Sequence, residues 1–286
     1  MNAWNLCDIE LHWETVEQLE NLQKKAEKKQ QCHFDRIYIG SYFCGRYFLH
    51  LVDRHLPIWM ELYKKHQLPF VVVLPIFSQT LLPEAREAIE KIRCSLGNAI
   101  AYFVVNDPGM LSALGTQNIP ICLGRLFAKD TRDFRDAGMR KRDMSCAFWN
   151  GMYQILRKEF SSVMGIELDN IYSLEALKLL KEDKETRLIL HTPYVYQSVG
   201  QICCYANLES ENNSGFYANR PCSYSCARYY LTYGEKENQL LRAGRAVLYK
   251  ESATKQEMEG LDICVWPFDL WEEEEEDEDT SAFTRV

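Results

Sequence analysis

The chain has 286 residues, of which 47% are hydrophobic and 26% are charged. This composition excludes a disordered, collagen-like or coiled-coil protein as a description of the whole chain. Eight of the 41 acidic residues form one run at 272–279, and the other 33 equal the 33 Lys and Arg. Outside that run the sequence is formally neutral, so charge does not indicate nucleic acid or an anionic membrane surface as a partner.

The first 14 residues show neither the basic nor the apolar segment of a signal peptide. The longest apolar run, 69–77, is about half the length that a membrane span needs. We therefore expect a cytoplasmic protein without a membrane span. In a reducing compartment the eleven cysteines are better explained by metal binding or buried thiols than by disulfides. Four of them occur in apolar or helical patterns and are expected in the core: Cys7, Cys94, Cys122 and Cys146.

Short apolar runs alternate with helical patterns as far as residue 191. About seven strand–helix units predict a parallel α/β architecture, a (β/α)8-type, TIM-like barrel in regular or distorted form. The sequence has no G-x-G-x-x-G motif after the first predicted strand and no P-loop, which argues against a dinucleotide-binding fold. Strands are predicted at 8–12, 36–41, 69–74, 99–106, 120–126, 164–168 and 187–191. Helices are predicted at 14–30, 57–66 (with Pro57 in the first turn), 83–96, 109–114, 149–160 and 173–181.

After this series the pattern changes. Residues 201–231 lack periodicity and are rich in Asn, Ser, Tyr and Cys, while 233–249 and 261–266 resemble short β segments. The expected organisation is a barrel domain at 1–195, a loop-rich cysteine-containing region at 196–270 that completes a metal site, and an acidic tail at 271–286. The tail is expected to be disordered and to act as a solubilising segment.

Four cysteine positions differ from those assigned to the core. Cys44 follows the strand run RIYIGS, at the carboxyl end of a strand, which is where barrel sites form. Cys203 and Cys204 come soon after the last predicted barrel strand, and Cys222 and Cys226 form a C-x3-C pair. One of Cys203 and Cys204, together with the other three, supplies four thiolates for a metal centre at the barrel mouth.

Two metal centres suit four thiolates, tetrahedral zinc and an iron–sulfur cluster. Structural zinc typically uses C-x2-C pairs, whereas here the pair is spaced by three residues and the other two cysteines are distant in sequence. A cubane cluster accommodates that spacing better, so a 4Fe–4S cluster is favoured, with unliganded thiols and zinc as the alternatives. No C-x3-C-x2-C motif occurs, so radical chemistry on S-adenosylmethionine is not indicated.

The order DIELHW, helix, RIYIGSYFCGRY, buried PFVVVL strand and late C-x3-C resembles the collagenase-like peptidase family, and more closely its UbiV branch of ubiquinone-biosynthesis proteins. In that branch a Tyr–aliphatic–Gly strand, here 38–40, ends a few residues before the first cluster cysteine, which corresponds to Cys44. The second cysteine follows a small polar segment, here 198–201. It falls on Cys203, with Cys204 as the alternative. The resemblance covers about residues 5–250.

This resemblance implies a barrel fold and a 4Fe–4S cluster on Cys44, Cys203, Cys222 and Cys226. It also implies a part in oxygen-independent hydroxylation of a quinone precursor or another small ring substrate, together with a second iron–sulfur subunit resembling UbiU, as a heterodimer. Two features depart from the family pattern. Seventeen residues separate Cys204 from Cys222, and the acidic tail is unexpected. Both put the substrate in question more than the cluster.

Two further functions are left open. One is a peptidase of the same family, although the sequence shows no G-x-S-x-G motif and no evident nucleophile–base pair. The other is a non-catalytic partner subunit whose cluster is structural. A few other side chains are candidates for the barrel mouth: Glu167 and Asp169 for proton transfer, His12 and His191 at strand ends, and Arg125 for an anionic ligand such as a carboxylate. Most of the tyrosines near the cysteines are expected to pack around the metal site: Tyr205, Tyr217, Tyr224, Tyr229 and Tyr230.

Overall fold

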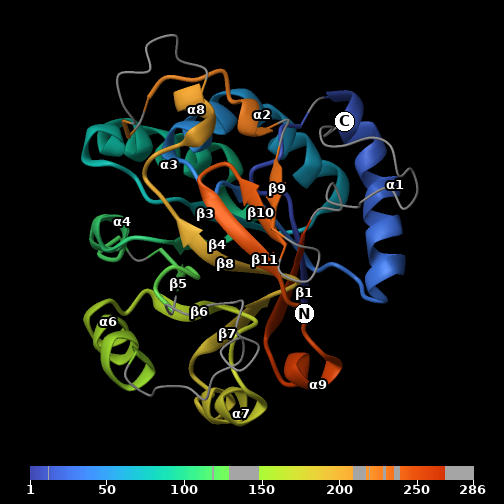
Figure 1. Ribbon diagram of the computed structural model, residues 1–286, viewed down its shortest axis with the longest axis vertical. Coiled ribbons are helices and arrows are strands. Elements are labelled where there is room, and N and C mark those ends of the chain that lie inside the picture. The colour runs from blue at the N-terminus through green and yellow to red at the C-terminus, as the bar shows by residue number, and fades with distance from the viewer. Residues whose placement is uncertain are drawn as a thin grey trace.

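The computed structural model describes residues 1–11, 13–117, 119–128, 148–208, 217–218, 220–227, 230–234 and 239–267. Within these ranges eight parallel strands close into a barrel surrounded by helices, which confirms the predicted TIM-like fold (Figure 1). Around the barrel the strands follow the order β1 (Asn2–Asn5), β12 (Ile263–Pro267), β7 (Arg187–His191), β6 (Val163–Asp169), β5 (Ile121–Leu123), β4 (Ile100–Val105), β3 (Phe70–Leu74) and β2 (Arg36–Gly40).

Helices connect these strands on the outside of the barrel. Most coincide with the predicted ones within a few residues, and Ser173 and Asp107 cap two of them by accepting backbone N–H bonds from Ala176 and Met110. The helices are α1 (Trp13–Gln30), α2 (Gly45–His66), α3 (Leu82–Leu96), α4 (Pro108–Leu114), α6 (Gln154–Glu159), α7 (Leu174–Glu182) and α9 (Lys255–Met258). Single turns precede or follow some of them: the 3-10 turns Gln79–Leu81 and Gly97–Ala99, and the π-helix Phe148–Tyr153.

The barrel strands are apolar on both faces because helices cover one side and the barrel core covers the other. All five residues of β3 are buried, as the uninterrupted run FVVVL requires. Inside the barrel the Tyr38 and Tyr102 hydroxyl groups meet at 2.9 Å, so these two large polar side chains satisfy each other away from water.

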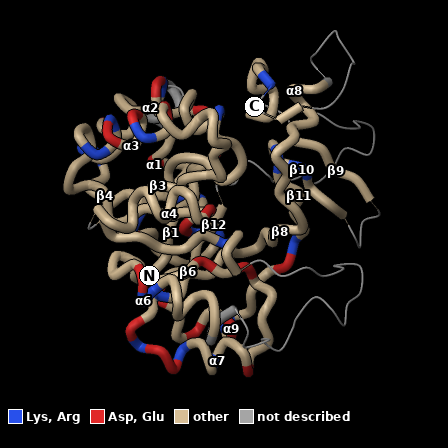
Figure 2. The backbone as a smooth tube through the Cα atoms, turned by 90° about the vertical axis from the view of Figure 1, so that its left-hand side faces the viewer, with Lys and Arg blue, Asp and Glu red and all other residues tan. Residues whose placement is uncertain are grey.

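A second, antiparallel sheet lies beside the barrel (Figure 2). Its strand order is β8 (Tyr194–Val199), β11 (Ala246–Lys250), β10 (Leu240–Ala243) and β9 (Leu231–Tyr233). Two short elements belong to the same region, α8 (Cys204–Leu208) and the 3-10 turn η4 (Ser225–Ala227). Strand β8 contacts the carboxyl end of the barrel directly, because its Tyr196 N–H bonds to Asp169 on β6.

Three expectations about the elements were wrong. The strand predicted at 8–12 is absent from the described residues of that range; β1 lies earlier, at Asn2–Asn5, and Ile9 and Leu11 are buried from a loop. The helix predicted from residue 57 begins twelve residues earlier, so Pro57 lies inside α2 rather than in its first turn. Cys94 is exposed on α3 rather than buried in the core. Cys7 and Cys122 are buried as expected, and Cys146 lies outside the described residues.

The barrel takes its last strand from the C-terminal part of the chain. Strand β12 pairs in parallel with β1 on one side and with β7 on the other. The chain therefore leaves the barrel after β7, builds the second sheet, and returns to close the barrel. This path places the loop-rich cysteine segments at the barrel end where β7 finishes.

Gly40 ends β2 just before the loop that leads to Cys44. Its φ of +102° is rarely adopted by other residues, and a Cβ atom there would lie 2.4 Å from the Val73 carbonyl oxygen. The glycine predicted as the end of the Tyr–aliphatic–Gly strand is therefore required by the close approach of β3.

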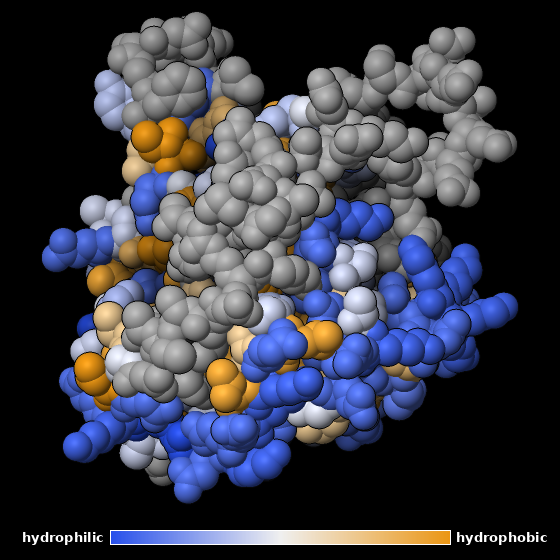
Figure 3. Space-filling model, turned by 60° about the horizontal axis from the view of Figure 1, so that its bottom comes forward, coloured by the Kyte–Doolittle hydropathy of each residue, from blue (hydrophilic) through white to orange (hydrophobic). Residues whose placement is uncertain are grey.

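Hydrophilic residues predominate on the described surface in Figure 3, where hydrophobic residues form small separate groups. The most exposed large apolar side chains include Ile155, Met152 and Leu179. Among the described helices, none combines the length and the hydrophobicity needed to cross a bilayer.

Candidate functional site

The carboxyl ends of the barrel strands gather a set of buried polar side chains. Glu167 and Asp169 come from the end of β6, and His191 is the last residue of β7, with Asp169 and His191 opposite each other in the strand register. Tyr42 follows β2 and Arg125 follows β5. These five residues occupy the barrel end at which enzymes of this fold carry their sites.

Three of these groups contact one another. The His191 Nε2 atom lies 3.1 Å from Glu167 Oε1, and the Tyr42 hydroxyl lies 3.2 and 3.3 Å from the two Glu167 oxygens and 3.3 Å from His191 Nε2. All three side chains are buried, and Glu167 is fully enclosed. A proton can therefore pass among a carboxyl, an imidazole and a phenol without crossing water.

Burial controls the protonation of His191 and Tyr42. It lowers the pKa of His191, and the nearby Arg125 charge lowers it further, while Glu167 opposes the shift. Burial and the Glu167 charge raise the pKa of the Tyr42 phenol well above its usual value. Near neutral pH the imidazole is therefore uncharged and the phenol keeps its proton.

We expect this burial to make the protein less stable in mild acid. Below the ordinary histidine pKa of 6.5 the unfolded chain binds a proton that the buried His191 does not, so the free energy of unfolding falls as pH falls. The slope reaches about 1.4 kcal/mol per pH unit for one proton. Urea unfolding at a series of pH values measures it, and His191→Gln should reduce the slope by that amount. An unchanged slope in the variant would contradict the buried neutral imidazole.

Arg125 is held inside the protein rather than left available for a ligand carboxylate. Its Nη1 lies 2.9 Å from Asp169 Oδ1 and donates to the Tyr194 carbonyl oxygen at 3.1 Å. The guanidinium also stacks 4.0 Å from the Tyr196 ring centroid and 4.8 Å from that of Tyr42. The carboxylate that Arg125 binds here thus belongs to Asp169 of β6. Binding of an anionic ligand by Arg125 stays a prediction.

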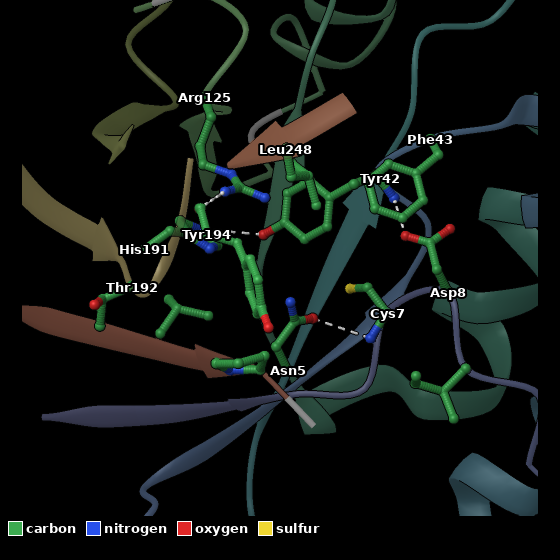
Figure 4. Close-up of a pocket in the computed structure, with 13 residues that line it drawn as sticks. Asn5, Cys7, Asp8, Tyr42, Phe43, Arg125, His191, Thr192, Tyr194 and Leu248 are labelled. Carbon is green, nitrogen blue, oxygen red and sulfur yellow. Dashed lines mark hydrogen bonds between the residues drawn. The ribbon is translucent and has the colours of Figure 1, made fainter. Parts of the chain in front are cut away.

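A small cavity opens beside this network (Figure 4). Its volume of about 60 Å³ holds a few water molecules or part of a small ligand. In Figure 4 the Tyr42 hydroxyl points toward His191, and Arg125 lies above Tyr194. The lining is aromatic and apolar with a few polar groups: Asn5, Cys7, Asp8, Ile9, Tyr42, Phe43, Arg125, His191, Thr192, Tyr194, Leu248, Val265 and Pro267.

Asp8 connects the cavity to the loop that carries Cys44. Its carboxylate accepts bonds from the Ser41 hydroxyl and, at 2.8 Å, from the Tyr42 N–H. The Ser41 oxygen in turn accepts the Cys44 N–H at 3.2 Å. Asp8 has a φ of +62°, a left-handed conformation that costs free energy in a non-glycine residue and tends to occur at functional sites.

Cys44 occupies the N-cap position of the 22-residue helix α2, and no acidic residue lies in the first turn. The helix dipole at that end favours negative charge.

Aromatic stacking places the C-x3-C segment against the start of the same helix. Tyr224, between Cys222 and Cys226, stacks on His50 of α2 with ring centroids 4.2 Å apart and contacts Tyr47 at 5.6 Å. Its backbone has a φ of +59°, so the segment turns sharply at this residue. The stack brings both cysteines of the pair to the end of α2 that Cys44 caps.

The remaining cysteine candidates lie at the start of α8, which packs against the η4 turn that contains Cys226. Burial raises the pKa of Cys203, while the N–H groups of Ala206 and Tyr205 lower it by bonding to its sulfur. Cys44 also acts on the pKa of Cys203. The choice of Cys203 over Cys204 stays a prediction.

The four predicted ligands influence one another electrostatically. Burial raises the pKa of Cys226 well above its usual value, and Cys44, Cys203 and Cys222 raise it further. These three cysteines therefore lie within electrostatic range of Cys226. As they stand, no three or more His, Cys, Asp or Glu side chains in the described ranges are arranged to hold a metal ion. The ligand set stays a prediction.

Some residues of this site were not singled out in the sequence. Tyr42 and Asp8 follow the ends of strands, where sites form in this fold, but the sequence does not show what they contact. The structure places Tyr42 against Glu167 and Asp8 against Ser41. Tyr196 lies on β8, which the sequence pattern did not predict, and packs on Arg125. The sequence candidates His12 and Tyr229 lie outside the described residues.

No protein-family model matches the chain, and no curated protein matches it significantly. The structure itself shows a TIM-like barrel whose carboxyl end holds a buried network of Tyr42, Glu167 and His191.

Proposed function

We propose that this protein is an iron–sulfur protein of an oxygen-independent hydroxylation system, with a 4Fe–4S cluster on Cys44, Cys203, Cys222 and Cys226. One observation carries the proposal. The segments that carry these cysteines are far apart in sequence but contact one another: Tyr224 of the C-x3-C segment stacks on His50 of α2, and α8 packs on η4.

The chemistry of the donor set fits such a centre. Four thiols in one neighbourhood are the usual ligands of a four-iron cluster, and zinc is the alternative metal. Cys44 lies at the N-terminal end of α2, where the helix dipole favours a negatively charged group such as a metal–thiolate centre. When bound, the cluster supplies a one-electron redox centre.

The chain's own residues then provide the ligand site and the proton path. The cavity beside Tyr42, Phe43 and Tyr194 takes part of a small ring substrate, with apolar walls that exclude water. His191 lines that cavity and exchanges a proton with the ligand, and Glu167 behind it holds or returns the proton at Oε1.

The resemblance to the UbiV branch supports a second iron–sulfur subunit as partner in a heterodimer, and hydroxylation of a quinone precursor or another ring compound. A peptidase fits the barrel mouth less well. Cys7 lines the cavity, but burial and the Asp8 charge raise its pKa well above the usual value, so it is a poor thiolate nucleophile. A subunit with a purely structural cluster remains the alternative without catalysis.

The decisive experiment is anaerobic purification followed by an absorption spectrum and chemical analysis of iron and acid-labile sulfide. We expect brown protein with iron and sulfide in equal amounts, approaching four of each per chain. A colourless protein with zinc or no metal would overturn the proposal. Adding the partner subunit to cluster-loaded protein separates the two remaining roles, because a hydroxylase subunit requires an intact His191 whereas a structural subunit does not.

A further inference from the structure

Arg245 lies between the two chain segments that carry Cys44 and Cys203. It occupies the turn between β10 and β11 and is only 3% exposed. Its Nε donates to the Phe43 carbonyl oxygen at 2.7 Å, one residue before Cys44. Its Nη1 donates to the Gln201 carbonyl and side-chain oxygens at 3.2 and 3.3 Å, two residues before Cys203.

The preceding glycine suits the turn. Gly244 has a φ of +56°, a left-handed conformation that other residues rarely adopt. The Arg245 carbonyl oxygen also accepts the Gly200 N–H at 3.1 Å. The hairpin turn is therefore fixed to both cysteine segments through main-chain and side-chain bonds.

One nitrogen of the Arg245 guanidinium stays unsatisfied. Among the described residues the buried Arg245 Nη2 has no hydrogen-bond partner, although an unpaired buried cationic N–H costs free energy. The Arg245 side chain is bonded to the segments that carry Cys44 and Cys203, and the sulfurs of a bound cluster accept hydrogen bonds.

We propose that Arg245 positions the cysteine centre, by holding the Cys44 and Cys203 segments together and by donating an Nη2 hydrogen bond to a sulfur atom of the bound cluster. This inference rests on the proposed function. Positive charge and hydrogen bonds at cluster sulfurs stabilise the more negative, reduced form and so raise the reduction potential. Arg245 is a positioning residue, because it acts through the centre rather than on the substrate.

The test compares anaerobically purified full-length protein with Arg245→Gln, Arg245→Lys and Arg242→Gln. The control residue Arg242 lies on β10 of the same hairpin. Redox titration with absorption and electron paramagnetic resonance measures the potential, and iron analysis measures loading. Arg245→Gln should lower the reduced-to-oxidised ratio at a fixed potential about tenfold, equivalent to about 59 mV for one electron. Arg245→Lys, which keeps the charge without the forked geometry, should shift less, and Arg242→Gln should match wild type.

A second measurement needs no cluster. A short bifunctional thiol reagent, dibromobimane, is applied to metal-free full-length protein, and the Cys44–Cys203 cross-link is quantified by peptide mass spectrometry. The cross-link should form several-fold more slowly in Arg245→Gln than in wild type, and at an intermediate rate in Arg245→Lys. If Arg245→Gln does not fold, the comparison of Arg245→Lys with wild type serves as the test. An equal rate in either folded variant overturns the positioning role.

The outcomes separate the two proposals. Wild-type protein with a normal cluster, together with an unchanged potential in both Arg245 variants, overturns the Arg245 inference and leaves the proposed function standing. Wild-type protein without iron overturns the proposed function and the sulfur hydrogen bond together. The cross-linking result then decides the remaining role of Arg245.

Discussion

Cys226→Ala and Cys44→Ala are each expected to yield folded protein that has lost its iron. Loss of a supporting group outside the ligand set already costs about 10–100-fold in metal affinity, and loss of a ligand should cost at least as much. Neither thiol belongs to the apolar core of the barrel: Cys44 caps α2 at its surface, and Cys226 lies on the single turn η4. Iron and sulfide analysis measures the loss, and thermal unfolding reports whether the fold is kept.

Cys94 provides the matched control. It is exposed on α3, so Cys94→Ala should retain full iron and an unchanged spectrum. Cys203→Ala and Cys204→Ala resolve the remaining choice, because Cys203 is the thiol on which Cys44 acts. Full iron in Cys44→Ala or Cys226→Ala refutes the ligand set, and full iron in Cys203→Ala transfers the role to Cys204.

Local patterns were sufficient to predict the barrel. Runs such as FVVVL at β3 are buried on both faces, as in the strands of a parallel sheet. Such runs alternate along the sequence with amphipathic helices, and this alternation is typical of a parallel α/β fold. The pattern failed where tertiary contacts outweigh it. The alternating DIELH run resembles a strand, but Asp8 takes a left-handed conformation and its carboxylate bonds to the loop after β2, which ends the strand before it.

The candidate site shows the same division. The position of Glu167 and His191 at strand ends was enough to indicate that they lie at the barrel mouth, where the structure brings them together, whereas the four-cysteine ligand set stays a prediction. Arg245 could not be found in this way. Its partners at Phe43 and Gln201 are 202 and 44 residues away, and nothing in the sequence near Arg245 signals either contact. Polar bridges between distant segments depend on the whole chain path.

The pairing of Arg125 with Asp169 has the largest expected effect on stability. Their side chains are only 6% and 3% exposed, so Arg125→Met leaves a carboxylate buried without its counter-charge. Removing one partner of such a pair costs about 3–5 kcal/mol. The Tyr42 and Tyr196 rings also lose the cation stacked between them.

Urea unfolding of the single and double variants separates the loss of the pair from the loss of packing. Arg125→Met combined with Asp169→Asn removes both charges while an amide oxygen still accepts the Tyr196 N–H, so it should recover most of the lost free energy. The exposed pair Arg93–Glu90 is the control, since Arg93→Met should cost no more than about 1 kcal/mol. A double variant as unstable as Arg125→Met would show that packing, rather than the unpaired Asp169 charge, accounts for the loss. The barrel mouth would then depend on Arg125 as a spacer between two tyrosine rings.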